Sequence, residues 1–241
     1  SQMQPFLIRP FVTAKVAFCL SHYLVYMVSA SHSFTSMYSI LVQAKTTECV
    51  PVLRRKAHML SLNVKVPSST GKMMAGTIDR PDGPAKAYAI FAHCFAGSRH
   101  TPGASRISKR LTEFGIATLR FDFPGLGQSE GDFADTSFSQ NVDDIVAAAK
   151  WLYKEFKAPQ LIMGHSLGGA AALKAATHPD LKKTLKAVAT VGAPFDPAHS
   201  VLHYADKIGD ADRDGYVPVI LGGRELIISR DFLEDLADTN P

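Results

Sequence analysis

The five residues Gly164-His165-Ser166-Leu167-Gly168 constrain the fold of this chain more than any other feature. They stand between an apolar run that ends at Met163 and an alanine-rich run that begins at Ala170. A serine between such glycines is typical of a sharp turn from a strand into a helix, where larger side chains at the glycine positions would clash. The serine hydroxyl then projects above the sheet, beside the N–H groups of the first helical turn. The pattern favours Ser166 as a nucleophile over an incidental serine in a glycine-rich turn.

Short apolar segments alternate with amphipathic ones from Leu60 onward, as in a mainly parallel sheet covered by helices. The clearest helix has one apolar stripe, with Ser137 and Gln140 as a capping box at its start. The sequence predicts strands over 60–66, 72–78, 87–92, 116–121, 160–163, 186–191, 217–221 and 225–228, and helices over 104–114, 138–156, 170–177 and 231–237. The first two strands are expected to form an edge hairpin, and the last two a hairpin about Gly222-Gly223.

A second motif, His93-Cys94-Phe95-Ala96-Gly97, follows a predicted buried strand. Acyl transfer needs two N–H groups aimed at the oxyanion that develops in the transition state. We assign these donors to the amides of Leu167 and Phe95. For His93, bracing of the loop through backbone hydrogen bonds is favoured over proton transfer, because the base that serves such a serine comes late in the chain. Cys94 is favoured as a small buried residue over a nucleophile.

The segment Asp122-Phe123-Pro124-Gly125-Leu126-Gly127-Gln128-Ser129 is a third motif. Its glycines and Gly131 lack the spacing of the dinucleotide-binding fingerprint. It therefore predicts a tight polar turn that holds the loop below the active site.

Composition excludes several other classes of protein. With 241 residues, 46% hydrophobic and 20% charged, the chain has the make-up of an ordinary globular protein of one domain. Cys19, Cys49 and Cys94 are too few and too scattered for a disulfide framework or a zinc site, so no metal is expected and a reducing compartment is the default. The net charge of +4 stems from residues 1–58, which hold six Lys or Arg against Glu48 alone, and nucleic-acid binding is not expected.

Residues 1–58 are a leader of uncertain nature, separate from the domain over 59–241. Arg9 and Lys15 precede an apolar run over 16–28, and Val28-Ser29-Ala30 is similar to a signal-peptide cleavage site. The run is short for a transmembrane helix. A signal peptide or anchor, a buried helical appendage and sequence not native to the domain all stay open, and export or membrane association is expected only for the first.

The three motifs, in this order and spacing, resemble the α/β-hydrolase superfamily. The closer similarity is to bacterial serine hydrolases of the serine aminopeptidase and monoglyceride-lipase type, including a subgroup fused to an OsmC-like peroxide-reductase domain. It extends from Leu60 to Asp238 and implies an α/β-hydrolase fold, a cytoplasmic location and hydrolysis of ester or related acyl bonds without an organic cofactor. Cys94 is a departure, because relatives outside this subgroup usually carry glycine there.

The resemblance further implies a late acid and histidine, in the order Ser, Asp or Glu, His. By the same resemblance, residues 195–241 belong to a cap inserted before the strands that carry them. We therefore expect the acid and base to lie beyond Pro241, and this chain, truncated at its C-terminus, to be inactive. Within the chain, Asp196 with His199 or His203 are the only groups in the right order. We favour a capping role for Asp196 and solvated positions for the two histidines over a catalytic role, since a base must contact its nucleophile.

The sequence thus predicts a serine hydrolase for small hydrophobic ester or acyl substrates, with the apolar hairpin over 217–228 setting substrate size. Two alternatives remain: a non-catalytic binding module that keeps the fold, and an accessory domain that serves a fused OsmC-like redox domain. These possibilities are distinguished by whether the reading frame continues past Pro241 into strands with an acid and a histidine, and then into a cysteine-bearing redox domain.

Overall fold

The computed structural model describes residues 17–20, 23–26, 42–43, 59–198, 213–221 and 223–239 of the chain. The chain divides into two units, residues 1–54 and 55–241. The first unit contains an antiparallel sheet of β1 (Ala17–Leu20), β2 (Tyr23–Tyr26) and β3 (Val42–Gln43). Part of the apolar run thus forms strands, whereas one sequence interpretation was a buried helix. No helix among the described residues is long and apolar enough to cross a membrane, and Val28-Ser29-Ala30 lies outside them.

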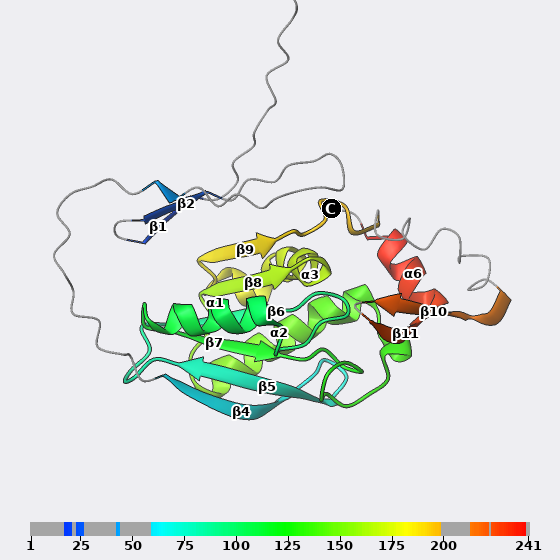
Figure 1. The fold of residues 1–241 in the computed structure, drawn as a ribbon, viewed down its shortest axis with the longest axis horizontal. Coiled ribbons are helices and arrows are strands. Elements are labelled where there is room, and N and C mark those ends of the chain that lie inside the picture. Colours follow the sequence, from blue (N-terminus) through cyan, green and yellow to red (C-terminus); the bar gives the residue numbers. More distant parts are fainter. Residues whose placement is uncertain are drawn as a thin grey trace, which may run out of the picture. The chain divides into compact units, whose positions relative to one another are not determined.

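A six-stranded sheet forms the centre of the second unit (Figure 1). The strands lie in the order β4-β5-β7-β6-β8-β9. Strands β7, β6, β8 and β9 are parallel to one another, β5 is antiparallel to β7, and β4 is antiparallel to β5. Their bounds are β4 (Leu60–Pro67), β5 (Met73–Arg80), β6 (Ala87–Ala92), β7 (Ile116–Phe121), β8 (Leu161–His165) and β9 (Ala187–Val191). This sheet confirms the predicted α/β class.

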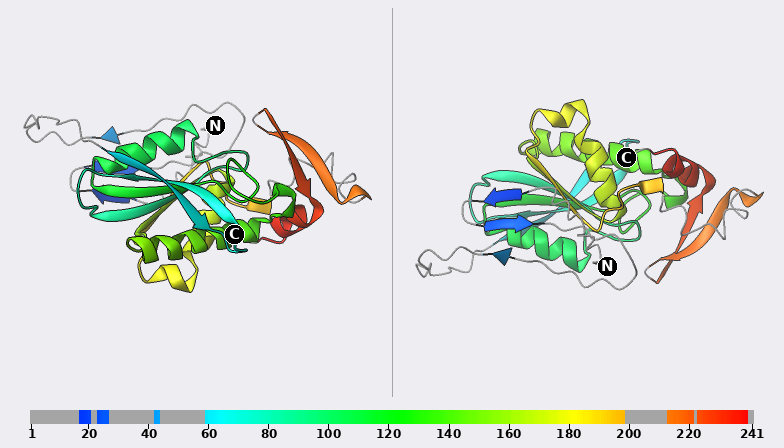
Figure 2. Two further views of the ribbon diagram at one scale, coloured as in Figure 1. Left: turned by 90° about the horizontal axis from the view of Figure 1, so that it is seen from below. Right: turned by 90° about the horizontal axis from the view of Figure 1, so that it is seen from above.

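Helices cover both faces of this sheet (Figure 2). On one face α1 (Pro102–Thr112) packs against β5 and β7, and on the other α2 (Phe138–Glu155) and α3 (Leu167–Ala176) pack against β4, β6, β8 and β9. In β6, Ile90 belongs to the main core, whereas Ala89 and Phe91 cluster with Ala104 of α1. Both faces of β6 are therefore buried, as its continuously apolar sequence predicts.

The remaining elements lie beyond the carboxyl ends of the parallel strands or connect them. The predicted late hairpin is confirmed, with Val217 paired to Ile228 in its register. Val217 and Ile228 are buried, whereas Ile220 and Ile227 are exposed. The elements outside the central sheet and its three covering helices are η1 (Phe133–Asp135), α4 (Pro179–Lys182), β10 (Tyr216–Leu221), β11 (Arg224–Ser229) and α6 (Arg230–Ala237).

Three sequence expectations differ from the structure. The first hairpin is not wholly at the edge, because β5 pairs with β7 on its far side and is buried along most of its length. The first helix starts at Pro102 rather than Ala104, since proline fits the first turn of a helix. The helix after the serine starts at Leu167 rather than Ala170, because Gly168 and Gly169 are helical residues here and not breakers.

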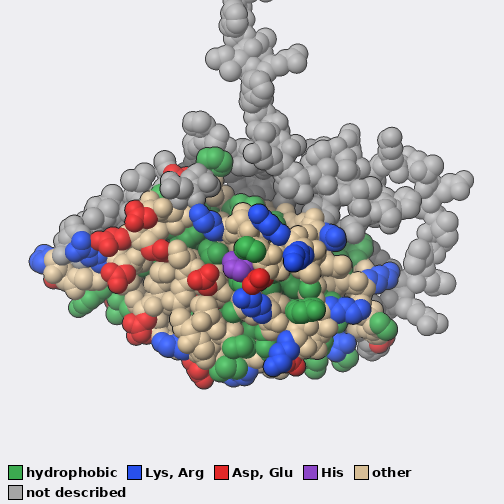
Figure 3. Space-filling view, turned by 180° about the vertical axis from the view of Figure 1, so that it is seen from behind, with side chains coloured by type: hydrophobic (Ala, Val, Ile, Leu, Met, Phe, Trp, Pro, Cys, Tyr) green, Lys and Arg blue, Asp and Glu red, His purple; other side chains and the backbone are tan. Residues whose placement is uncertain are grey.

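Charged side chains of both signs are interspersed on the face opposite to that of Figure 1 (Figure 3). One carboxyl, Asp144 of α2, is instead fully buried. Its Oδ1 accepts hydrogen bonds from the N–H and the hydroxyl of Ser69 at 2.8 and 2.7 Å, and its Oδ2 has no partner among the residues that the structure describes. Burial raises the pKa of Asp144, with the Ser69 hydrogen bonds opposing that effect.

We expect Asp144→Asn to stabilise the protein at about pH 7. A folded-state pKa above the ordinary value means that the stability contribution of this carboxyl is present at low pH and lost as pH rises through the folded-state pKa. The asparagine keeps the acceptor for Ser69 and never ionises, so its advantage in the urea midpoint should grow with pH. Asp82→Asn, at an exposed turn, is the control without this trend. A wild-type advantage that grows with pH would contradict the prediction.

Candidate active site

Ser166 stands on the turn from β8 into α3, with φ 53° and ψ −127°. Among the described residues it is the single non-glycine residue with positive φ. Its N–H donates to the carbonyl of Val191 at 2.9 Å, and its own carbonyl accepts from the N–H of Gly169 at 2.8 Å. Its hydroxyl does not cap α3, although Ser166 is the N-cap residue. Strain of this kind persists only where the surroundings impose it, and it is frequent at active sites.

Three glycines impose this turn by letting backbone segments approach closely. A Cβ at Gly164 would lie 2.3 Å from the carbonyl oxygen of Gly168, and one at Gly168 would lie 2.1 Å from that of His93. A Cβ at Gly169 would lie 2.8 Å from the Cβ of Ala193. The start of α3 is therefore pressed against the ends of β6 and β8, which confirms the sequence-based reason for the glycines.

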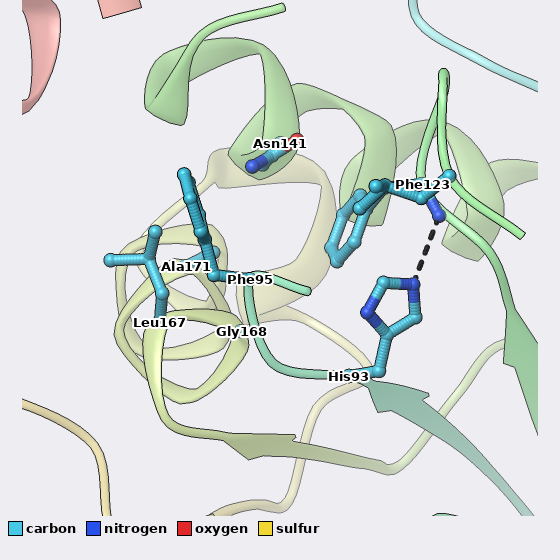
Figure 4. Close-up of a pocket in the computed structure, with 8 residues that line it drawn as sticks. His93, Phe95, Phe123, Asn141, Leu167, Gly168 and Ala171 are labelled. Carbon is cyan, nitrogen blue, oxygen red and sulfur yellow. Dashed lines mark hydrogen bonds between the residues drawn. The ribbon is translucent and has the colours of Figure 1, made fainter. Parts of the chain in front are cut away.

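His93 opens the loop of residues 93–99, which we call the oxyanion loop because the sequence analysis predicts an oxyanion donor, Phe95, within it. Its Nε2 accepts from the N–H of Phe123 at 3.2 Å, and its Nδ1 lies 2.7 Å from the carbonyl of Cys94 (Figure 4). Because Nε2 accepts, Nδ1 carries the proton and donates it to that carbonyl. Both ring nitrogens thus bind backbone groups, and the predicted bracing role of His93 is confirmed. Cys94 is half-buried, and burial raises the pKa of its thiol.

Phe95 and Leu167, the predicted oxyanion donors, border the same small cavity (Figure 4). Leu167 is the first residue of α3, so its N–H has no acceptor within the helix. The N–H of Phe95 donates to no other backbone group in the described ranges. Asn141 also borders the cavity, and its buried Oδ1 has no hydrogen-bond partner there. The cavity volume is about 10 Å³, close to the space that one water needs.

A buried ion pair that the sequence did not reveal holds the end of the oxyanion loop. Arg99 and Asp122 are 4% and 0% exposed, and their side chains form an ion pair. Asp122 Oδ1 also accepts from the N–H of Arg99 at 2.5 Å, and its Oδ2 accepts from the N–H of Gln128 at 3.0 Å. A Cβ at Gly127 would lie 2.2 Å from the Asp122 carboxylate. The polar turn after Asp122 is present as predicted, and Asp122 also holds the end of the oxyanion loop, which the sequence did not indicate.

A second buried pair extends this network across the sheet. Arg120 of β7 pairs with Asp79 of β5 at 2.9 Å and donates to the carbonyl of Arg99. Asp79 also accepts from the hydroxyls of Ser61 and Ser108, each at 2.5 Å. The oxyanion loop is thereby tied to β5, β7 and α1.

Of the predicted acid and bases, Asp196 alone lies among the described residues. Asp196 is half-buried after β9 and accepts from the N–H of Ala198 at 2.9 Å, a local cap. His199 and His203 lie outside the described residues. His178 caps α4 by accepting from the N–H of Asp180 at 3.2 Å. Burial lowers the pKa of His165, which favours its neutral form.

No cluster of three or more His, Cys, Asp or Glu side chains in the described ranges could hold a metal ion. The candidate site therefore consists of Ser166, the N–H groups around it and the network that supports the oxyanion loop.

Comparisons with known proteins agree with this fold. Residues 83–211 match the family model of the serine aminopeptidases, S33. A search of curated proteins found no match. The esterase domain of a Rhodothermus marinus protein is 36% identical, with a TM-score of 0.52 over 74% of this chain and 68% of that one.

More distant structures share the fold alone. A putative hydrolase from Agrobacterium vitis S4 is 19% identical, with a TM-score of 0.57 over 74% of this chain and 71% of that one. Est1E from Butyrivibrio proteoclasticus, solved with ferulic acid, is 20% identical, with a TM-score of 0.56 over 73% and 71% of the two chains. With more than half of its length matched by the family model, the chain belongs to the serine aminopeptidase S33 family of α/β hydrolases.

Proposed function

We propose that the protein hydrolyses ester or related acyl bonds with Ser166 as the nucleophile. The positive φ of Ser166, on a turn that three close-packed glycines impose, is the observation that carries this proposal. Such a turn presents the serine at the top of the sheet, beside the start of a helix. The similarity to an esterase domain supports the same reaction class.

In this mechanism Ser166 Oγ attacks the substrate carbonyl and gives up its proton to a base. The N–H groups of Phe95 and Leu167 stabilise the negative oxygen of the tetrahedral intermediate, and each such donor contributes about 3 kcal/mol. The intermediate collapses with loss of the alcohol, and water then releases the acid from the acyl-serine. The reaction needs no metal or organic cofactor.

We place the acid and the base outside these 241 residues, so that the isolated chain is a poor catalyst. His93 uses both ring nitrogens for backbone hydrogen bonds, and Asp196 caps its own turn. His199 and His203, with Asp196, are the candidates within the chain. A serine without a base stays a neutral hydroxyl, and the loss of one triad member costs several orders of magnitude in rate.

The substrate that we propose is a small hydrophobic ester. Ile220 and Ile227 on the β10–β11 hairpin are 77% and 43% exposed, and an apolar acyl group would cover such side chains. The hairpin leads into α6, whose Phe232 contacts Phe95 at the candidate site.

Fluorophosphonate labelling with mass spectrometry tests this proposal. We expect little or no adduct on the folded 241-residue chain, and any adduct that forms should be on Ser166 and absent from Ser166→Ala. Rapid stoichiometric labelling of Ser166 would contradict our placement of the base, and its loss in His199→Ala or His203→Ala would identify the base. An adduct on another residue would contradict Ser166 as the nucleophile.

A further inference from the structure

The oxyanion loop is anchored by polar contacts at both ends but not at Phe95. At its start, the two ring nitrogens of His93 bind backbone groups of Cys94 and Phe123. At its end, the backbone and side chain of Arg99 bind Asp122. Between them, Phe95 makes no backbone hydrogen bond in the part of the chain that the structure describes. The Cys94 carbonyl of the same peptide unit accepts from His93 Nδ1 and from the N–H of Gly97, and the packing of the Phe95 side chain is the remaining restraint on the direction of the Phe95 N–H.

Two aromatic rings hold that side chain. Phe95 contacts Phe133 and Phe232 edge to face, with ring centroids 5.1 and 5.2 Å apart. Phe133 and Phe232 contact each other at 5.7 Å, which closes a triangle of rings. Phe232 is 1% exposed and Phe133 is 5% exposed. The three rings come from the oxyanion loop, η1 and α6, segments that are far apart in the sequence.

The helix that carries Phe232 is itself fixed. Asp235 of α6 accepts hydrogen bonds from the N–H and the hydroxyl of Ser139 at 2.7 and 2.6 Å, which ties α6 to the first turn of α2. Ser229 caps α6 by accepting from the N–H of Phe232 at 3.2 Å. The ring of Phe232 is thus presented to Phe95 by a helix with little freedom to shift.

Phe95 also borders the small cavity lined by Phe123, Leu126 and Ala171. A side chain in a closely packed interior cannot move without overlapping its neighbours, and a void removes this restraint locally. Without the ring of Phe232, the side chain of Phe95 could shift toward the small cavity or into the space that Phe232 had filled. The contact with Phe232 opposes this shift.

We infer that Phe232 is a positioning residue: its ring holds Phe95 so that the Phe95 amide points at the developing oxyanion. This inference rests on the proposed function, since it assigns a role to that same site. It also gives α6 a part in positioning the site.

Kinetics with p-nitrophenyl acetate, an ester too small to depend on the hairpin, test the inference in the protein with its acid and base present. Phe232→Ala should lower kcat by roughly 10- to 100-fold and leave KM within about twofold. The reason is that the weakened interaction, the hydrogen bond from the Phe95 amide to the oxyanion, forms only in the transition state. Phe232→Leu, which keeps most of the volume, should recover part of this loss. Leu236→Ala, buried on the same helix, is the matched control and should keep kcat close to wild type.

Hydrogen exchange on the 241-residue chain gives a second readout that needs no activity. The N–H of Gly97 donates to the carbonyl of Cys94 at 2.8 Å, so its exchange reports opening of the oxyanion loop. We expect faster exchange at Gly97 in Phe232→Ala and in Phe232→Leu, but not in Leu236→Ala. Equal exchange in wild type and both Phe232 variants, or equal loss of kcat in Phe232→Ala and Leu236→Ala, would overturn the inference. Full activity of Ser166→Ala would instead overturn the proposed function.

Discussion

Replacing Ser166 by alanine or glycine should abolish ester hydrolysis, with kcat lowered by roughly 10⁶-fold in the protein that has its acid and base. In the proposed mechanism the hydroxyl oxygen is the atom that attacks, and no neighbouring group would replace it. Rates with p-nitrophenyl acetate measure the loss. Ser105→Ala, a serine of α1, should keep the wild-type rate. A loss of less than about 100-fold would show that the chemistry does not depend on Ser166.

At position 166, glycine should give a more stable protein than alanine, which is the reverse of their usual order in a helix. Alanine keeps the Cβ that makes φ 53° unfavourable, whereas glycine adopts that backbone freely. Such strain costs on the order of 1–3 kcal/mol, so Ser166→Gly should unfold at higher urea concentration than Ser166→Ala. In the interior of α1 the order is normal: Ser105→Gly should be less stable than Ser105→Ala by about 1 kcal/mol. The same order at both positions would contradict a strained turn at Ser166.

The sequence was sufficient to predict those parts of the fold that depend on local patterns. The β6 strand and the β10–β11 hairpin follow from apolar runs and from the Gly222-Gly223 turn. The turn at Ser166 follows from glycines within five residues of each other. Each of these features is decided by neighbours along the chain. The bounds of β6 and of the two hairpin strands agree with the predicted ones to within about one residue, whereas the helix after Ser166 begins earlier than predicted.

The support of the site could not be predicted, because it depends on residues far apart in the sequence. Arg99 gave no signal, since a charged residue in a loop is usually exposed, and Asp122 is 23 positions away. The ring triangle joins Phe95 to Phe232 through a fold that brings α6 to the oxyanion loop. The glycines after Asp122 predicted a tight turn there but not its buried partner.

Asp122→Ala should be among the most destabilising substitutions in the described domain, at about 3–5 kcal/mol. It leaves the Arg99 guanidinium buried, with the side chains of Gln128 and Thr77 as its remaining hydrogen-bond partners. A loss of this size is a large share of the 5–15 kcal/mol that a typical domain has in total. Urea unfolding measures it. Asp180→Ala, in the exposed ion pair with Lys150 at 2.8 Å, is the matched control and should leave the urea midpoint close to that of the wild type.

The double variant Arg99→Met with Asp122→Ala separates a lost attraction from a stranded charge. If the stranded guanidinium is the main cost, removing it as well should restore part of the stability, although the double variant has fewer hydrogen bonds than Asp122→Ala. Equal or additive losses would contradict this explanation. Even a stable double variant should hydrolyse esters slowly, because Asp122 also holds the N–H of Arg99 and thereby the end of the oxyanion loop. Stability and catalysis would then depend on the same carboxylate for different reasons: neutralisation of the buried guanidinium, and placement of the loop that carries Phe95.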